Sequence, residues 1–333
     1  MKKVAFLSMD PHELHGKIHE PLLVEPFSRL GYEVDLFVNY HNYLDVNWSG
    51  YVAVVIRTTW DYQQHVDLFV RCLSYIRTNY PQLMLRNEVD AVLWNINKLY
   101  LLELGTAAGI PTVPTIFSEM AAAGTTPKSV VQVVRDAFAH FNATQLVIKP
   151  TIGASSSFTF RLSIEEFDPS SKDFSEPVNE CLETNRGSCL GLLETVFEHR
   201  GYMIQPYLPS IENHGEISVF VFGDGCFSHA VKKLPAVGDF RVQEEYGGVN
   251  TNCSDLLLDD EPLKDLVNKI QRYLRESKKW DVLYMRVDVM KHEDKYVVGE
   301  VELIEPSLYL NMDERSPQRF AEMFHEMFCR WSK

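Results

Sequence analysis

The first hundred residues alternate short apolar runs with longer stretches that mix apolar and charged side chains, and this alternation constrains the fold most. Strands separated by helices are typical of an open parallel sheet. We therefore predict a mixed α/β chain whose N-terminal part is such a sheet. The expected strands are at residues 4–9, 32–38, 51–56 and 83–85, with helices at 21–30 and 65–77.

Charged and aromatic side chains follow the third expected strand, at the end of a parallel sheet where ligands usually bind. Arg57 could pair with a substrate carboxylate and Asp61 could hold an ammonium group, while Trp60 and Tyr62 would wall the pocket. That set describes an amino-acid-like ligand. The alternative is structural, with core aromatics and an internal ion pair between Arg57 and Asp61.

The pattern changes after Pro111 and Pro114, where we place a domain boundary because prolines cannot continue the helix expected at 99–108. The remainder is rich in strands. Residues 168–187 are rich in Ser, Pro, Asp and Glu and predict a surface excursion. The expected strands are 146–149, 157–162, 201–205, 216–221, 226–232, 284–290 and 296–304, with helices at 189–199 and 261–277.

A lysine ends the strand expected at 146–149, and small residues follow it, including Ser155 and Ser156. Backbone N–H groups in such a loop can close on an anion, so Lys149 and the loop suit a polyphosphate. The order of a Walker A loop is absent. The alternative is an ordinary Gly/Ser hairpin.

Carboxylates gather on the last two expected strands. Asp288 lies on one of them, and Glu300, Glu302 and Glu305 lie on or after the next. Carboxylate oxygens from adjacent strands can converge on Mg²⁺, which binds a few carboxylates together with nucleotide phosphates. A solvated hairpin face is the alternative, although the apolar neighbours of these residues would make unpaired buried carboxylates costly.

The stretch 202–209 is an apolar strand that runs into two prolines, and Glu216 follows it. An extended segment of this kind can offer backbone groups to a planar base, with a carboxylate near the ribose. By itself it could equally be a hinge.

The order of these features resembles the ATP-grasp superfamily over residues 90–330. Within it the chain is similar to the glutathione synthetase and ribosomal-protein glutamate ligase branch, and more narrowly to cyclo-ligases of the cycloserine pathway. The shared patterns are Arg57-x-x-Trp60-Asp61-Tyr62, Gly238-Asp239-Phe240-Arg241 and Glu302-Leu303-Ile304-Glu305-Pro306. The resemblance implies an ATP-grasp fold with an N-terminal domain at 1–95, a small subdomain at 96–205 and a large subdomain at 206–333 that carries the metal site.

The resemblance also implies roles for the matching residues. Arg241 would stabilise the transferring phosphoryl group, Arg286 would stabilise the carboxylate under attack, and Lys233 would face the acyl phosphate. The metal ligands would be Asp288, Glu302, Glu305 and Ser307. The nucleotide would be bound by Lys98, Lys149, Ser155, Ser156, Gln205, Tyr207, Leu208 and Glu216.

The metal motif departs from the family in one place. The family closes its site with Glu-x-Asn, where this chain has Glu305-Pro306-Ser307, and a serine is a weaker ligand than an amide carbonyl. Strand alternation also puts Glu300 and Glu302 on one face and Glu305 on the other unless a bulge intervenes. The sequence therefore leaves open which glutamate bridges the metal ions.

The resemblance implies an ATP-dependent carboxylate-amine ligase that acts through an acyl phosphate on a small amino-acid-like or short peptide substrate, with ring closure within one molecule as one form. The cofactors would be ATP and two Mg²⁺ ions, or Mn²⁺. Two other classes stay open, namely a kinase that phosphorylates a hydroxyl and a non-catalytic ATP-binding regulatory protein, which Ser307 favours.

Composition excludes several partners. The chain has 32 Lys and Arg against 46 Asp and Glu, a net charge of −14 that repels nucleic acid and anionic lipid, and no apolar run long enough to span a membrane. Six scattered cysteines indicate a reduced chain, so we expect a cytoplasmic protein. A homodimer is left open.

Overall fold

The computed structural model describes residues 1–14, 18–118, 129–154, 156–167, 190–242 and 246–333. They form two compact units, one of Met1–Pro111 with Ser210–Lys333 and one of Thr112–Pro209. The surface excursion expected at 168–187 lies outside the described residues. The three-domain division expected from the sequence stays a prediction.

The first sheet of the larger unit is parallel, as the sequence predicts. Its strand order is β2-β1-β3-β4, and every neighbouring pair is parallel. The β1 and β3 strands are buried along most of their length, which explains their unbroken apolar sequences. The strands are β1 (Lys2–Ser8), β2 (Tyr32–Asn39), β3 (Ala53–Thr58) and β4 (Met84–Arg86).

The second sheet of this unit is antiparallel, with the order β11-β10-β9-β12-β13. Four of these strands were predicted, and the short edge strand β11 was not. The strands are β9 (Glu216–Phe222), β10 (Cys226–Leu234), β11 (Val249–Asn252), β12 (Tyr284–His292) and β13 (Lys295–Glu302).

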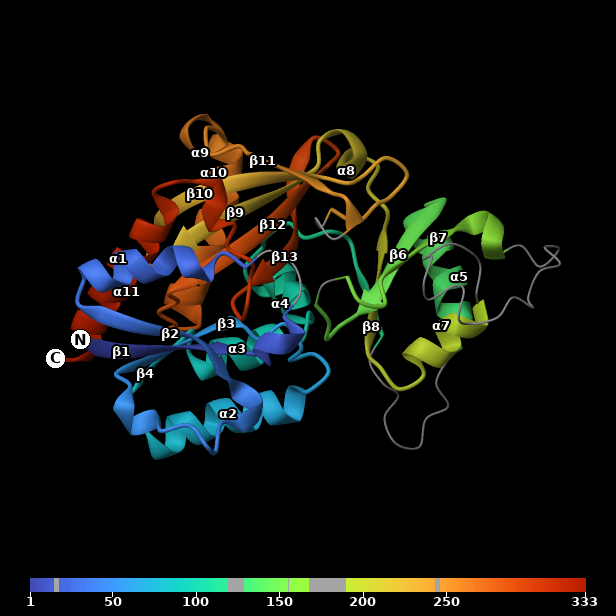
Figure 1. Ribbon diagram of the computed structural model, residues 1–333. Helices are drawn as coiled ribbons and strands as arrows, with labels where there is room; N and C mark the ends of the chain where they lie inside the picture. The colour runs from blue at the N-terminus through green and yellow to red at the C-terminus, as the bar shows by residue number, and fades with distance from the viewer. Residues whose placement is uncertain (15–17, 119–128, 155, 168–189, 243–245) are drawn as a thin grey trace. The chain divides into compact units, whose positions relative to one another are not determined.

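Two helices, α1 and α11, lie between the two sheets of the larger unit (Figure 1). Phe27 of α1 packs on Phe324 of α11 with ring centroids 4.8 Å apart, and Phe320 packs on Phe222 of β9 at 5.2 Å. One apolar core therefore joins both sheets. Helix α11 was not predicted, although its apolar residues recur at helical spacing.

The remaining helices of this unit are short except for α2 and α10. Asp260 caps α10 by accepting a hydrogen bond from the Leu263 N–H, and Pro262 occupies its first turn. Helix α3 was not predicted. The helices of the unit are α1 (Val24–Arg29), α2 (Val66–Asn79), α3 (Val89–Ile96), α4 (Tyr100–Ala107), α8 (Ser210–Asn213), α9 (Leu256–Asp259), α10 (Glu261–Arg272) and α11 (Ser316–Trp331).

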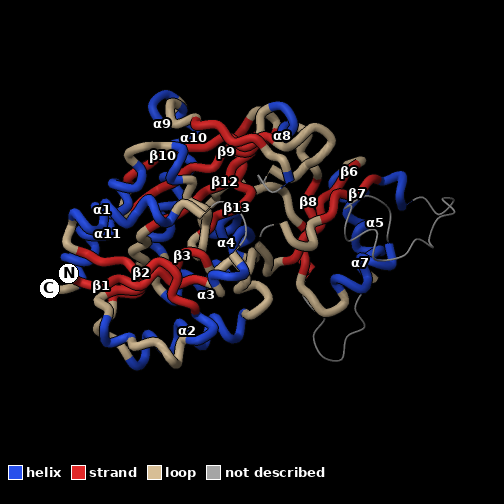
Figure 2. The backbone as a smooth tube through the Cα atoms, viewed as in Figure 1, coloured by secondary structure: helices blue, strands red, loops and turns tan. Residues whose placement is uncertain are grey.

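The smaller unit is an antiparallel sheet with two helices packed together against it (Figure 2). The strand order is β5-β8-β6-β7. The short strand β5 and the helix α5 were not predicted. The elements are β5 (Ile116–Ser118), α5 (Val130–Phe141), β6 (Gln145–Pro150), β7 (Phe160–Ser163), α7 (Leu190–Phe197) and β8 (Tyr202–Pro206).

Two buried asparagines tie the N-terminal segments to the antiparallel sheet. Asn95 of α3 donates to the Val301 carbonyl at 2.8 Å and accepts from the Leu303 N–H at 2.7 Å. Asn87 donates to the carbonyls of Leu303 at 2.7 Å and Tyr284 at 2.9 Å. Because the groups that they bond are buried, these side chains replace backbone pairing where β13 ends.

We predict that Asn95→Ala lowers the free energy of unfolding by about 3 kcal/mol, because it leaves the Val301 carbonyl and the Leu303 N–H buried without partners. Urea denaturation measures the change. Asn79→Ala, at the exposed end of α2, is the matched control and should change stability by less than about 0.5 kcal/mol. Equal stability of the two variants would contradict the role given to Asn95.

Candidate active site

Carboxylates from two adjacent strands, β12 and β13, meet in the antiparallel sheet of the larger unit. Asp288 of β12 is opposite Glu300 of β13, and a bulge at Gly299 follows, since Val289 pairs with Val298. One oxygen each from Asp288, Glu300 and Glu302 lies within 4.8 Å of the others. The structure thus brings together two predicted metal ligands, Asp288 and Glu302, and adds Glu300.

Three cations pair with these carboxylates. The Arg286 guanidinium donates to Asp288 from Nε at 3.0 Å and from Nη2 at 2.9 Å, and it also donates to Glu302. Lys98 lies 2.9 Å from Glu300. The predicted catalytic residue Arg286 and the predicted nucleotide ligand Lys98 therefore both belong to one cluster.

The third cation, Lys233 of β10, lies 3.1 Å from Glu216 and 3.6 Å from Asp288. Gly215 makes this approach of β9 to β10 feasible: its φ is +74°, and an added Cβ would stand 2.5 Å from the Lys233 carbonyl oxygen. Only glycine fits there without a shift of the backbone. Glu216 and Lys233 were predicted to serve ribose and acyl phosphate, and here they form a buried ion pair.

Burial and neighbouring charges shift the pKa values of the clustered carboxylates in opposite directions. For Asp288, burial alone would raise the pKa, but Arg286 and Lys233 lower it to about 2. Burial raises the pKa of Glu302 to about 7 against the opposing charge of Arg286. Burial also raises the pKa of Glu305 well above its usual range, and Glu302 adds to that rise.

The cluster fits a divalent cation. Among the described residues, five carboxylates face three cations, so the charge is not balanced when all groups are ionised. Burial is the main cause of the raised pKa values of Glu302 and Glu305, and the neighbouring carboxylates add to it. Oxygen ligands at this spacing are the kind that Mg²⁺ binds. The carboxylates are Glu216, Asp288, Glu300, Glu302 and Glu305, and the cations are Lys98, Lys233 and Arg286.

Glu305 belongs to the same surroundings although strand alternation would place it on the other face. The strand ends at Glu302, and the chain that follows no longer alternates. Glu305 is buried and acts on the pKa of Lys98 together with Glu300 and Glu302. The Ser307 carbonyl lies 3.5 Å from Nη1 of Arg286.

The segment expected to bind substrate is packed against this cluster. The Trp60 indole donates to the Glu305 carbonyl at 3.1 Å, and Tyr62 is buried. Arg57 is fully buried and donates to Glu20 at 3.0 Å and to the Pro306 carbonyl at 2.9 Å. The internal ion pair considered for Arg57 therefore has Glu20 as its partner and not Asp61.

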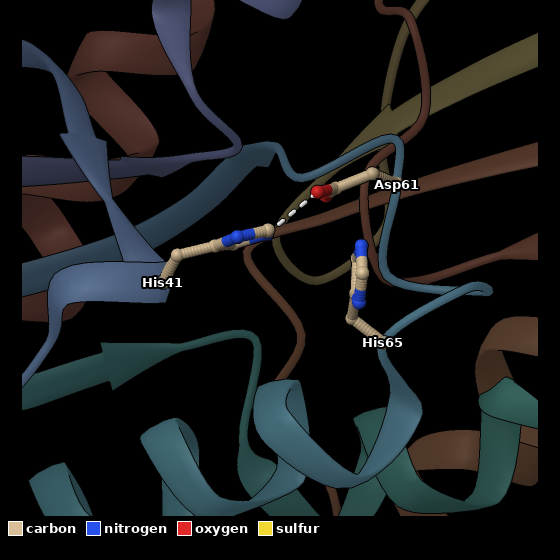
Figure 3. A group of neighbouring side chains, drawn as sticks. All are labelled: His41, Asp61 and His65. Carbon is tan, nitrogen blue, oxygen red and sulfur yellow. Dashed lines mark hydrogen bonds and ion pairs between the residues drawn. The ribbon is translucent and has the colours of Figure 1, made fainter.

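Asp61 is bound by two residues that the sequence did not single out. The Tyr40 hydroxyl donates to one carboxylate oxygen at 2.9 Å, and His41 Nε2 lies 2.6 Å from the other (Figure 3). His65 stands beside them. No local motif signals this group, because His41 follows β2 while Asp61 and His65 follow β3.

The smaller unit carries the other predicted nucleotide ligands. Lys149 lies on β6 and is half-buried. The Gln205 amide donates to the Thr115 hydroxyl at 2.9 Å, and the Tyr207 ring covers the Arg161 guanidinium at 3.8 Å. Leu208 is buried and Ser156 is partly exposed, whereas Ser155 lies outside the described residues.

Arg241 has Asp239 and Tyr246 as its partners. Its Nη2 lies 2.7 Å from Asp239, and its guanidinium stacks on Tyr246 at 3.6 Å.

A further member of the carboxylate cluster, Ser218, donates a hydrogen bond to Asp288 and was not predicted. Strand alternation could have found it, since Ser218 lies two residues after Glu216 on β9.

Comparisons with known proteins agree on the fold. A family model described as the N-terminal domain of the D-cycloserine synthetase DcsG matches residues 4–84. The cycloserine biosynthesis protein DcsG of Streptomyces lavendulae is 27% identical over 292 residues, which are 84% of this chain and 85% of that protein.

Solved structures extend the likeness to the whole chain. The crystal structure of D-cycloserine synthetase DcsG aligns with a TM-score of 0.74 and 24% identity, over 98% of this chain and 99% of that one. The ATP-grasp ligase PsnB, solved with a minimal precursor, Mg and ADP, aligns with a TM-score of 0.58 and 12% identity, over 99% of this chain and 98% of that one. The chain has the fold of the ATP-grasp ligases. Among the described residues, no helix is long and apolar enough to cross a membrane.

The raised pKa of Glu302 predicts a pH dependence of the protein's stability. A folded-state pKa of about 7 lies above the unfolded value, so its stabilising effect is present at low pH and is lost as pH rises through 7. We expect the free energy of unfolding to fall by about 2 kcal/mol between about pH 5 and about pH 8 in metal-free buffer through this group. Glu302→Gln should flatten that slope.

The exposed Glu314 provides the matched control, because Glu314→Gln should leave the pH slope of the wild type unchanged. Urea denaturation at several pH values with a chelator measures both variants. A slope that stays as steep in Glu302→Gln as in the wild type would show that Glu302 does not hold a proton in the folded protein.

Proposed function

We propose that this protein is an ATP-grasp ligase that couples ATP cleavage to amide formation on a small amino-acid-like substrate through an acyl phosphate. The observation that carries this proposal is the buried cluster in which Asp288, Glu300 and Glu302 lie beside Arg286 and Lys233. It offers metal ligands and fixed cations on neighbouring strands of the sheet. The names of the relatives, which concern cycloserine, support ring closure within one molecule.

ATP and a divalent cation would be bound by the residues that match the family pattern. Asp288, Glu300 and Glu302 would hold Mg²⁺, with Glu305 and Ser307 as further ligands; two ions, or Mn²⁺ in their place, are part of the proposal. When bound, Mg²⁺ neutralises charge on the ATP phosphates during transfer. The proposed nucleotide contacts are Lys98 and Lys149 to phosphates, Ser155 and Ser156 from the loop, Gln205, Tyr207 and Leu208 to adenine, and Glu216 to ribose.

The reaction would proceed in two steps. An oxygen of the substrate carboxylate attacks the γ-phosphorus, the bond to ADP breaks, and an acyl phosphate forms. The substrate amine then attacks the carbonyl carbon, the bond from that carbon to the phosphate oxygen breaks, and the amine loses a proton. The products are ADP, inorganic phosphate and an amide, so no side-chain nucleophile is needed.

The fixed cations would lower the barriers of both steps by stabilising negative charge. Asp288 holds the Arg286 guanidinium by two hydrogen bonds, so its orientation is set before the substrate carboxylate arrives. Lys233 has a raised pKa because Asp288 and Glu216 outweigh burial and Arg286, so it is protonated and able to face the acyl phosphate. Arg241 would stabilise the transferring phosphoryl group.

The substrate would lie against the segment after β3, where Trp60 already contacts the backbone of Glu305. Trp60 and Tyr62 would form its apolar walls. The carboxylate-binding role of Arg57 and the ammonium-binding role of Asp61 stay predictions, since Arg57 is bonded to Glu20 and Asp61 is bonded to Tyr40 and His41.

The test measures ADP release with Mg-ATP against a panel of amino acids and short peptides, singly and in pairs. We expect turnover with particular acceptors only. Lys149→Ala and Asp288→Asn should each lower kcat/KM by about a hundredfold or more, because each removes a charge that stabilises the transferring phosphoryl group or its metal ion.

Lys269→Ala, at an exposed position of α10, is the matched control and should retain wild-type turnover. Full activity of Lys149→Ala would contradict its phosphate contact, and full activity of Asp288→Asn would contradict the metal site. ATP binding without ADP release for any acceptor would favour the non-catalytic alternative.

A further inference from the structure

A second group of potential metal ligands lies at the carboxyl edge of the parallel sheet. It consists of His41, Asp61 and His65, each of which offers one atom within 4.8 Å of the other two. His41 follows β2, Asp61 follows β3, and His65 immediately precedes α2. Figure 3 shows the two imidazole rings approaching the Asp61 carboxylate from different elements.

The carboxylate of this group is held in a fixed orientation. One Asp61 oxygen accepts a hydrogen bond from the buried Tyr40 hydroxyl at 2.9 Å, which leaves the other oxygen directed at His41 Nε2, 2.6 Å away. Ligating carboxylates in metal sites are oriented by hydrogen bonds of this kind. The Tyr40 contact therefore prepares Asp61 as a ligand.

The histidine rings are placed to complete a site. Their centroids are 4.9 Å apart and their planes are 73° to each other. Asp61 is buried, His41 is partly exposed and His65 is exposed, so an ion can reach the group from solvent. The His65 side chain does not cap α2, although it stands at the first position where a cap could form.

The ligand chemistry selects the class of ion. Mg²⁺ prefers oxygen ligands only, whereas two imidazoles with one carboxylate suit Zn²⁺ and neighbouring first-row divalent ions such as Co²⁺. We propose that His41, Asp61 and His65 bind one Zn²⁺-type ion, at a site separate from the carboxylate cluster around Asp288. Three protein ligands leave a further coordination position for water or a small ligand.

An ion here would join three segments of the larger unit. It would link the end of β2, the loop after β3 and the start of α2, and that loop carries Trp60, whose indole is bonded to the Glu305 carbonyl. Metal binding should therefore raise the melting temperature of the protein. In this assignment Asp61 serves the metal, and substrate contacts after β3 fall to Trp60 and Tyr62.

His65 distinguishes the metal site from a simple ion pair. The contact between His41 and Asp61 could hold the loop without any metal, and it would not need His65. A metal site needs all three residues. His65 is exposed and makes no capping bond, so replacing it removes a ligand without disturbing the core.

The experiment titrates the chelator-treated full chain with Co²⁺ near neutral pH, without nucleotide, and follows the visible absorption of the bound ion. We expect saturation at one equivalent of this absorbing species and its displacement by Zn²⁺. His65→Ala and His41→Ala should each weaken binding by about tenfold or more. The exposed His199, in the smaller unit, provides the control, and His199→Ala should bind as the wild type does.

Asp288→Asn separates the two candidate metal sites, and it should leave the Co²⁺ absorption unchanged. The proposal is overturned if the wild type shows no saturable absorption, if His65→Ala binds as tightly as the wild type, or if Asp288→Asn alone abolishes binding. Because no ATP is present, the outcome does not depend on the ligase proposal. Circular dichroism of each variant confirms that a loss of binding reflects a lost ligand rather than unfolding.

Discussion

Both backbone groups of Leu303 are held by buried asparagine side chains, and the geometry of the carboxylate cluster depends on this contact. Asn95 accepts from the Leu303 N–H, and Asn87 donates to its carbonyl. Leu303 is the first residue after β13, between Glu302 and Glu305. Because the backbone of Leu303 is fixed, the chain turns out of the strand there, and both Glu302 and Glu305 stay near Lys98. A strand that simply continued would have turned Glu305 to the opposite face.

The pKa values of the clustered carboxylates depend on two facts. The carboxylates are buried, and among the described residues they outnumber the cations beside them. The positive charges of Arg286 and Lys233 lower the pKa of Asp288. Burial raises the pKa values of Glu302 and Glu305. Such a group can relieve its charge by taking up protons or by binding a divalent cation. At neutral pH the second route would bring a metal ion to the point where a phosphoryl group would be transferred. Metal binding would then both stabilise the cluster and serve its proposed chemistry.

The sequence predicts the parallel sheet, the strands that carry the carboxylates and the order of the family motifs, because strand alternation and β-branched runs are local signals. It does not predict which partner each charged residue takes. Glu20 lies 37 residues from Arg57, and the register that sets Asp288 opposite Glu300 depends on how two strands pair and not on either strand alone. The helices α5 and α11 have apolar residues at helical spacing, but their places against the sheets come from packing between distant segments. His41 and His65 were not predicted either, because they come from separate segments that only the fold brings together.

In the proposed reaction the substrate carboxylate becomes an acyl phosphate before the amide forms. The most direct test labels the carboxylate of the substrate found in the ADP assay with oxygen-18 and examines the products by phosphorus NMR. We expect inorganic phosphate to carry one labelled oxygen from the carboxylate, because the bond between carbon and oxygen breaks when the amine attacks. Unlabelled phosphate, or a phosphorylated product without free phosphate, would contradict an acyl phosphate and point to attack on ATP by water or by a hydroxyl.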